Sequence, residues 1–193
     1  MAYGQKYYNQ WNGNDTLIII HIGSNDIHHL NFECSKKILN FCVKNKKSIN
    51  ENINDIVDII FNIIKNIYEI GGKNFMLMNI PPFELSPQNR DKKKNFYINE
   101  IQYFNTLLIK KANKLFNKYN DINIIIYNTN EEYRYIIKEY KKFNFKTINE
   151  MYKDNENHPS DDYFWNDYTH ITDKGNKILA YDINDLLESI NKS

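Results

Sequence analysis

Three short hydrophobic runs lie along the first two thirds of the chain. They span Thr16–Ile22, Phe75–Ile80 and Ile122–Tyr127. A short hydrophobic run without regular polar alternation is typical of a strand that is buried on both faces of a parallel sheet. Each run therefore predicts one strand of such a sheet.

Helical spacing of hydrophobic residues marks the segments between and after these runs. The predicted helices are Asn50–Ile70, Phe96–Tyr119, Glu131–Tyr140 and Lys174–Ile190. Asn50–Ile70 is the clearest, because isoleucines recur every three or four positions and Gly71-Gly72 follow it, as a left-handed C-cap requires. Strands that alternate with helices of this length predict an α/β fold of parallel βαβ units, in one domain over residues 1–193.

Other stretches lack a clear period. We expect Phe83–Lys94 to be a loop and Phe143–Tyr163 to be irregular and polar. Ile27–Lys47 has no strong pattern, although Ser35–Leu39 is compatible with the start of a short helix.

Composition narrows the function classes. The chain has 25 Lys and Arg against 24 Asp and Glu among 193 residues, so no basic face predicts a nucleic-acid partner. No run is long enough for a membrane span and no apolar signal segment is present, so localisation stays open.

Cys34 and Cys42 have neither redox nor zinc spacing, which favours free thiols and leaves a single disulfide open. His28-His29 lack a third ligand at a fixed offset, so we predict no metal site.

A polar turn follows the first predicted strand directly. Its residues are Gly23-Ser24-Asn25-Asp26. Open α/β sheets bind ligands at the carboxyl ends of their strands, so Asn25 is a candidate binding residue and Gly23 permits the sharp turn. The alternative is that Ser24, Asn25 and Asp26 only cap the next element.

A second polar cluster precedes the last helix. Asp167 and His170 are three residues apart, so in a helical turn their side chains share a face. A carboxylate there can accept the histidine Nδ1–H, fix the tautomer and stabilise the imidazolium during proton transfer. The alternative is that Thr172 or Asp173 caps the last helix and His170 only packs nearby. Asp167 and His170 lie on a loop after the last strand of the sheet. We therefore expect them at the same edge of the sheet as Asn25.

Taken together, Gly23-x-Asn25-Asp26 and Asp167-x-x-His170 resemble two sequence blocks of the GDSL, or SGNH, ester hydrolases. The segment GGKNFMLMNIPPFELSP is similar to the passage between those blocks, and the resemblance runs from Trp11 to Leu187. It is closest to the fungal carbohydrate-acetylesterase and plant GDSL-lipase-like branch.

The resemblance implies a flavodoxin-like, three-layer parallel sheet and a serine esterase without a cofactor. Asn25 would donate to the oxyanion, His170 would be the general base and Asp167 would orient it. The substrate would be an ester, with acetylated polysaccharide or oligosaccharide as the expected class. An extracellular location is compatible with that class.

One departure from the family is large. The sequence contains no Gly-Asp-Ser block, so the nucleophile is unknown, and Ser24 does not take that part in the family's scheme. The family has a further block whose glycine supplies another oxyanion donor, and this block also has no match in the sequence. We therefore expect an N-terminally truncated domain that lacks its first two strands.

The predicted strand at Thr16–Ile22 supports that expectation on physical grounds. In a truncated domain this strand would lack a neighbouring strand on one side. A long hydrophobic strand at the edge of a sheet is an aggregation site that proteins avoid. Either an N-terminal portion exists elsewhere or a partner covers the edge. The competing function is a catalytically inactive module that binds a glycan or a protein. A nucleotide-binding domain is disfavoured, because no strand leads into a glycine-rich phosphate loop.

Overall fold

A computed structural model describes residues 12–35, 47–90 and 97–191, without the side chains of residues 31–35 and 191. The chain forms two compact units. Unit 1 is Met1–Ile80 with Asn99–Asn128, and unit 2 is Pro81–Ile98 with Thr129–Ser193.

Unit 1 is built on a parallel sheet of three strands, β1 (Leu17–Ile20), β2 (Asn74–Met78) and β3 (Asn123–Tyr127). Their order in the sheet is β1-β2-β3. β2 lies between the other two, and its Phe75, Met76 and Leu77 are almost fully buried. The predicted α/β class with parallel strands is confirmed.

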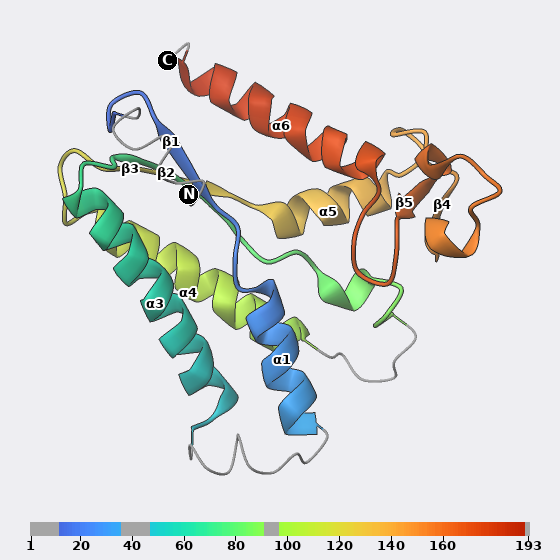
Figure 1. The fold of residues 1–193 in the computed structure, drawn as a ribbon, viewed down its shortest axis with the longest axis horizontal. Helices are drawn as coiled ribbons and strands as arrows, with labels where there is room; N and C mark the ends of the chain where they lie inside the picture. Colours follow the sequence, from blue (N-terminus) through green and yellow to red (C-terminus); the bar gives the residue numbers. More distant parts are fainter. Residues whose placement is uncertain (1–11, 36–46, 91–96, 192–193) are drawn as a thin grey trace, which may run out of the picture. The chain divides into compact units, whose positions relative to one another are not determined.

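Helices α3 (Ile49–Glu69) and α4 (Ile98–Phe116) connect these strands and lie side by side on the same side of the sheet (Figure 1). Asn54 on α3 donates to the Tyr103 hydroxyl on α4 at 2.9 Å. Ser48 begins α3 with a capping box, in which its hydroxyl accepts from the Glu51 N–H. Gly71 follows α3 with φ = 106°, so the predicted glycine C-cap is confirmed.

The first strand and the segment after it differ from the prediction. β1 is shorter than Thr16–Ile22, and it is not buried on both faces, since Ile19 is 50% and Ile22 47% exposed. Among the described strands β1 pairs only with β2, so its outer edge lacks a neighbour that would cover these side chains.

Helix α1 (Ser24–Ser35) begins directly after Gly23. The rest of the predicted Ser35–Leu39 helix lies outside the described residues, as do the side chains of Cys34 and Cys42.

Unit 2 contains helices α5 (Thr129–Lys138) and α6 (Asp173–Asn191) and a second sheet, in which β4 (Thr147–Met151) and β5 (Tyr163–Trp165) are parallel. The expectation of an irregular stretch over Phe143–Tyr163 is therefore wrong. β4 was missed because its sequence, TINEM, is half polar and carries no hydrophobic run. The predicted loop after Pro82 contains the short 3-10 helix η2 (Phe83–Leu85). Two more short 3-10 helices are η3 (Tyr152–Asp154) and η4 (Ser160–Asp162).

The core of unit 2 is mainly aromatic. Its buried members are Tyr133, Ile136, Phe145, Phe164, Trp165, Ile171 and Leu179. The Phe164 ring meets the rings of Tyr133 and Phe145 edge-on, with centroids 5.6 Å apart in both pairs. Such edge-to-face pairs add to the hydrophobic stabilisation and restrict ring orientation, so β5 is firmly held.

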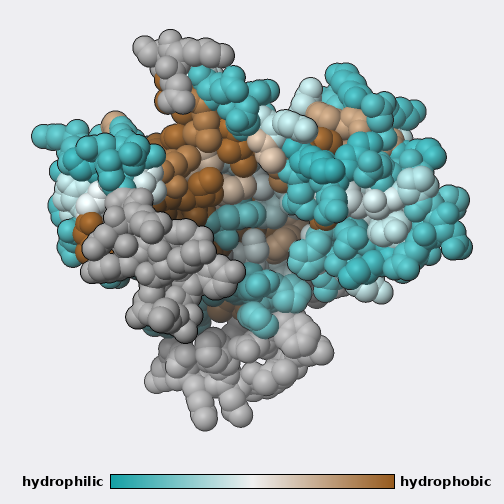
Figure 2. All heavy atoms as spheres, turned by 45° about the horizontal axis from the view of Figure 1, so that its top comes forward, coloured by the Kyte–Doolittle hydropathy of each residue, from teal (hydrophilic) through white to brown (hydrophobic). Residues whose placement is uncertain are grey.

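Hydrophobic side chains also reach the surface. Figure 2 shows a larger hydrophobic area in the upper middle of the face that it presents and smaller hydrophobic spots elsewhere, within largely hydrophilic surroundings. Exposed large residues of unit 1 include Ile19 and Ile22 beside β1 and Ile59, Ile63 and Ile70 from α3 and its C-terminal end. No helix in the described part of the chain is long and apolar enough to cross a membrane.

Candidate active site

The loop that carries Asp167 and His170 is closed at its base by unit 2's core. Trp165 and Ile171, both buried, face each other in an antiparallel bridge on its two sides. The Asn166 N–H donates to the His170 carbonyl at 2.8 Å, and the Thr172 N–H donates to the Phe164 carbonyl at 2.9 Å. The loop is a tight turn and not the helical turn that the three-residue spacing suggested.

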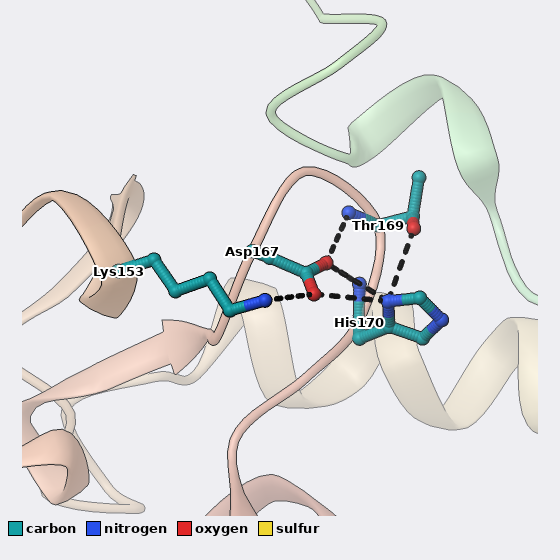
Figure 3. A network of polar contacts seen from close by, with 4 residues as sticks. All are labelled: Lys153, Asp167, Thr169 and His170. Atoms are coloured by element: carbon teal, nitrogen blue, oxygen red, sulfur yellow. Dashed lines mark hydrogen bonds and ion pairs between the residues drawn. The ribbon is translucent and has the colours of Figure 1, made fainter.

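Asp167 organises this turn through its carboxylate (Figure 3). Oδ1 accepts the backbone N–H of Thr169 at 3.1 Å and that of His170 at 2.9 Å. Oδ1 also lies 2.9 Å from His170 Nδ1, and Oδ2 lies 3.1 Å from the same nitrogen. The Asp167 side chain is only 18% exposed. The predicted hydrogen-bonded pair is present, and one carboxylate fixes both the backbone and the imidazole of His170.

Lys153 adds a charge to this network. Its Nζ lies 3.3 Å from Asp167 Oδ2, and its backbone N–H donates to the Asn166 carbonyl at 3.0 Å. Burial by itself raises the pKa of Asp167, but the N–H groups of His170 and Thr169, the His170 imidazole and Lys153 together hold that pKa well below its usual range. Asp167 is thus ionised whenever the protein is folded near neutral pH.

The imidazole of His170 presents its other nitrogen away from Asp167 (Figure 3). Because the ionised carboxylate accepts at Nδ1, the proton of the neutral ring is on Nδ1 and Nε2 has a free lone pair. The His170 side chain is 77% exposed, and no described residue hydrogen-bonds to Nε2. This nitrogen is available to take a proton from a nucleophile.

An open pocket of about 520 Å³ lies beside the pair within unit 2. Its lining includes Asp167, His170, Lys153, Asp154 and the exposed aromatic ring of Tyr168. Among the residues that the structure describes, the lining contains no serine or cysteine. Ser160 is in η4, outside this lining, and the Thr169 hydroxyl lies 3.4 Å from Nδ1, the nitrogen that faces Asp167. The described residues of unit 2 therefore supply a base and an orienting acid but no hydroxyl that hydrogen-bonds to Nε2.

The polar turn Gly23-Ser24-Asn25-Asp26 lies in unit 1, where β1 is followed by α1. Gly23 has φ = 109°, and a Cβ at this position would lie 2.5 Å from Phe104 Cζ. Only glycine fits both the backbone and the contact. The Gly23 carbonyl accepts the Ile27 N–H at 3.0 Å, which starts α1. Asn25 is exposed in the first turn of α1, three residues past Ile22.

The sheet-edge argument that linked the two clusters does not hold. β1 belongs to the three-stranded sheet of unit 1, whereas β5, which precedes Asp167, pairs only with β4 among the described strands. The approach of Asn25 to His170 therefore stays a prediction. Lys153 and Thr169 were missed by the sequence reasoning, because a lysine 14 residues before an aspartate carries no recognisable spacing.

No metal-ligand cluster appears in the described ranges, where no three His, Cys, Asp or Glu side chains converge. His28 and His29 meet with ring centroids 6.0 Å apart.

Two comparisons with known proteins bear on this geometry. The model of the family described as GDSL-like lipase/acylhydrolase matches residues 3–183, a range that includes Gly23, Asn25, Asp167 and His170. The curated proteins include no match to the chain.

Proposed function

The chain belongs to the GDSL-like lipase/acylhydrolase family, and we propose that it hydrolyses esters with Asp167 and His170 as its proton-transfer pair. The observation that carries the proposal is the 2.9 Å contact between Asp167 Oδ1 and His170 Nδ1. In the neutral imidazole this contact puts the proton on Nδ1 and leaves a lone pair on Nε2, at the side of the ring that points away from the carboxylate. This is the arrangement that a histidine base needs in acyl transfer.

Each residue then has one part in the reaction. His170 Nε2 takes the proton of a serine hydroxyl as its oxygen attacks the ester carbonyl. The imidazolium, stabilised by Asp167, then gives that proton to the departing alcohol. A water molecule repeats the sequence on the acyl-serine, which releases the carboxylic acid and restores the serine.

We assign the oxyanion donor to Asn25. The amide is exposed at the start of α1, and it forms no hydrogen bond with another described residue, so it is available to a ligand. Gly23 places it there, since no other residue fits between the end of β1 and the Phe104 ring. Loss of one such donor lowers kcat by about 10²–10³, so Asn25→Ala should lower the rate of a complete enzyme by that factor.

The nucleophile comes, in this proposal, from outside the 193 residues. The sequence has no Gly-Asp-Ser block. β1 has an edge that no described strand covers, and Ile19 beside it is half exposed. A parallel strand that carries the serine at its carboxyl end and pairs with this edge would bury Ile19 and bring the serine to the ligand-binding end of the sheet.

For the substrate we propose acetyl esters of carbohydrates. Tyr168 lines the pocket beside His170 and is 63% exposed. An exposed tyrosine offers a flat apolar face and a polar hydroxyl, which suits a sugar ring with its apolar faces and hydroxyl rim.

Acetate release from acetylated xylo-oligosaccharides by the product of the whole reading frame tests this function. We expect release that His170→Ala abolishes. The competing function, an inactive module, predicts that the oligosaccharide binds and no acetate appears. An in-frame Gly-Asp-Ser block upstream in the gene would favour the enzyme before any assay.

A further inference from the structure

A second hollow, unrelated to the hydrolytic residues, lies between α3 and α4 of unit 1. Its volume is about 270 Å³. Phe61 from α3 and Leu115 from α4 line it, and each is only 4% exposed. Each helix therefore contributes one largely buried apolar side chain, and these two side chains form the apolar base of the hollow.

Positive charge surrounds this base. Lys65, Lys111, Lys114 and Lys118 line the hollow, against a single carboxylate, that of Asp58. Lys111 pairs with Asp58. The other three lysines form no ion pair with a described residue, although Lys118 Nζ lies 4.9 Å from the centre of the Tyr119 ring. The whole chain is nearly neutral, at +1, so this concentration of one sign is local.

Helix geometry brings these groups together. Asp58, Phe61 and Lys65 are spaced three and four residues apart along α3, and Lys111, Lys114, Leu115 and Lys118 repeat the same spacing along α4 and just beyond it. Residues at such spacing share one helix face. A fixed cleft with like charges at its rim focuses the field and attracts an anion of matching size.

From these observations we propose that the hollow binds an amphiphilic organic anion, a medium-chain fatty-acid carboxylate. The alkyl chain packs on Phe61 and Leu115, which removes its apolar surface from water. The carboxylate lies among Lys65, Lys114 and Lys118 and relieves their mutual repulsion. A bare inorganic anion leaves the apolar base uncovered, and a neutral alcohol leaves the lysines unpaired, so both bind more weakly.

The site uses no residue assigned to ester hydrolysis. If octanoate does not bind, the proposed ester hydrolysis is therefore unaffected. If the chain proves to have no esterase activity, the proposed anion site is likewise unaffected.

Calorimetric titration of the protein with octanoate at low salt tests the proposal. We expect saturable binding at one site, weakened at least tenfold by Lys114→Glu with Lys118→Glu and by 0.5 M NaCl, about the ionic strength at which exposed charges are largely screened. Lys110→Glu is the matched control, because Lys110 is exposed on α4 and does not line the hollow. It should reduce octanoate affinity by less than twofold.

Two further titrations define the ligand class. Octanol and inorganic phosphate should each bind at least tenfold more weakly than octanoate. Phosphate that binds as tightly as octanoate would overturn the amphiphile assignment. Absence of octanoate binding, or equal loss in Lys110→Glu and in the double variant, would overturn the site. The neutral variant Lys114→Gln with Lys118→Gln, checked for an unchanged thermal transition, separates loss of attraction from loss of folding.

Discussion

The Asp167 carboxylate holds His170 at three points: it lies 2.9 Å from the imidazole Nδ1 through Oδ1, 3.1 Å from the same nitrogen through Oδ2, and 2.9 Å from the backbone nitrogen through Oδ1. One side chain thus sets the position of the histidine and the proton on its ring. These contacts lie within a single turn of unit 2, and Lys153 adds a contact to the same carboxylate, with its Nζ 3.3 Å from Oδ2.

Asp167→Asn should change the tautomer of His170. An asparagine amide can donate to Nδ1, which moves the imidazole proton to Nε2 and removes the base from the pocket. The equivalent change in a serine protease lowers kcat by about 10⁴. Nitrogen-15 NMR of the imidazole shows the tautomer directly, without any substrate.

Asp154→Asn is the matched control for that experiment, because Asp154 lines the same pocket and makes no hydrogen bond to His170. Its spectrum should keep the Nδ1–H form. An Asp167→Asn protein that also keeps this form would show that the carboxylate does not set the tautomer.

Acid should weaken the protein through Asp167. The folded state lowers the pKa of this carboxyl below its unfolded value of about 3.9. Its contribution to the free energy of unfolding is therefore complete above about pH 4 and is lost as pH falls toward the depressed folded value. Urea unfolding at pH 6 and pH 3 should show a smaller acid loss in Asp167→Asn than in the unchanged protein. Equal losses in the two proteins would contradict the assigned network.

Gly23→Ala should destabilise unit 1. The methyl group would meet the Phe104 ring at 2.5 and 2.8 Å. Such overpacking costs about 1–3 kcal/mol, and the positive φ adds about 1–2 kcal/mol for a residue with a Cβ. Gly71→Ala provides the comparison, since Gly71 also has a positive φ but no atom lies within 4 Å of its added Cβ. Thermal unfolding should show the larger loss for Gly23→Ala, and equal losses would show that the Phe104 contact is unimportant.

The open edge of β1 should make the 193-residue chain associate. Ile19 and Ile22 are about half exposed beside an edge with no described partner strand, and such edges pair with other chains. Light scattering should detect oligomers that Ile19→Lys disperses. Ile109→Lys, at another exposed isoleucine, should not disperse them. A monomeric chain with a cooperative thermal transition would contradict this and favour a self-sufficient binding module.

The sequence predicted the elements whose chemistry is local. The isoleucine repeat in α3 and the glycine after it predicted both the helix and its end. The Asp167–His170 hydrogen bond was also predicted, although the turn that brings the two side chains together is not helical. Prediction was poorer where contacts between residues distant in the sequence determine the local structure. The polar strand β4 exists because it pairs with β5, and Gly23 is required by a ring 81 positions away at Phe104.

Hydrolysis of p-nitrophenyl acetate by four proteins tests whether His170 acts as the base for a serine that these 193 residues do not supply. They are the 193-residue chain, its His170→Ala variant, and both again with a Gly-Asp-Ser strand segment added at the N-terminus. Loss of the serine nucleophile costs on the order of 10⁶ in kcat in a serine protease, so the first two should not exceed background. The extended chain should gain a rate that His170→Ala removes. A robust rate in the 193-residue chain alone, or a gained rate that survives His170→Ala, would contradict the account.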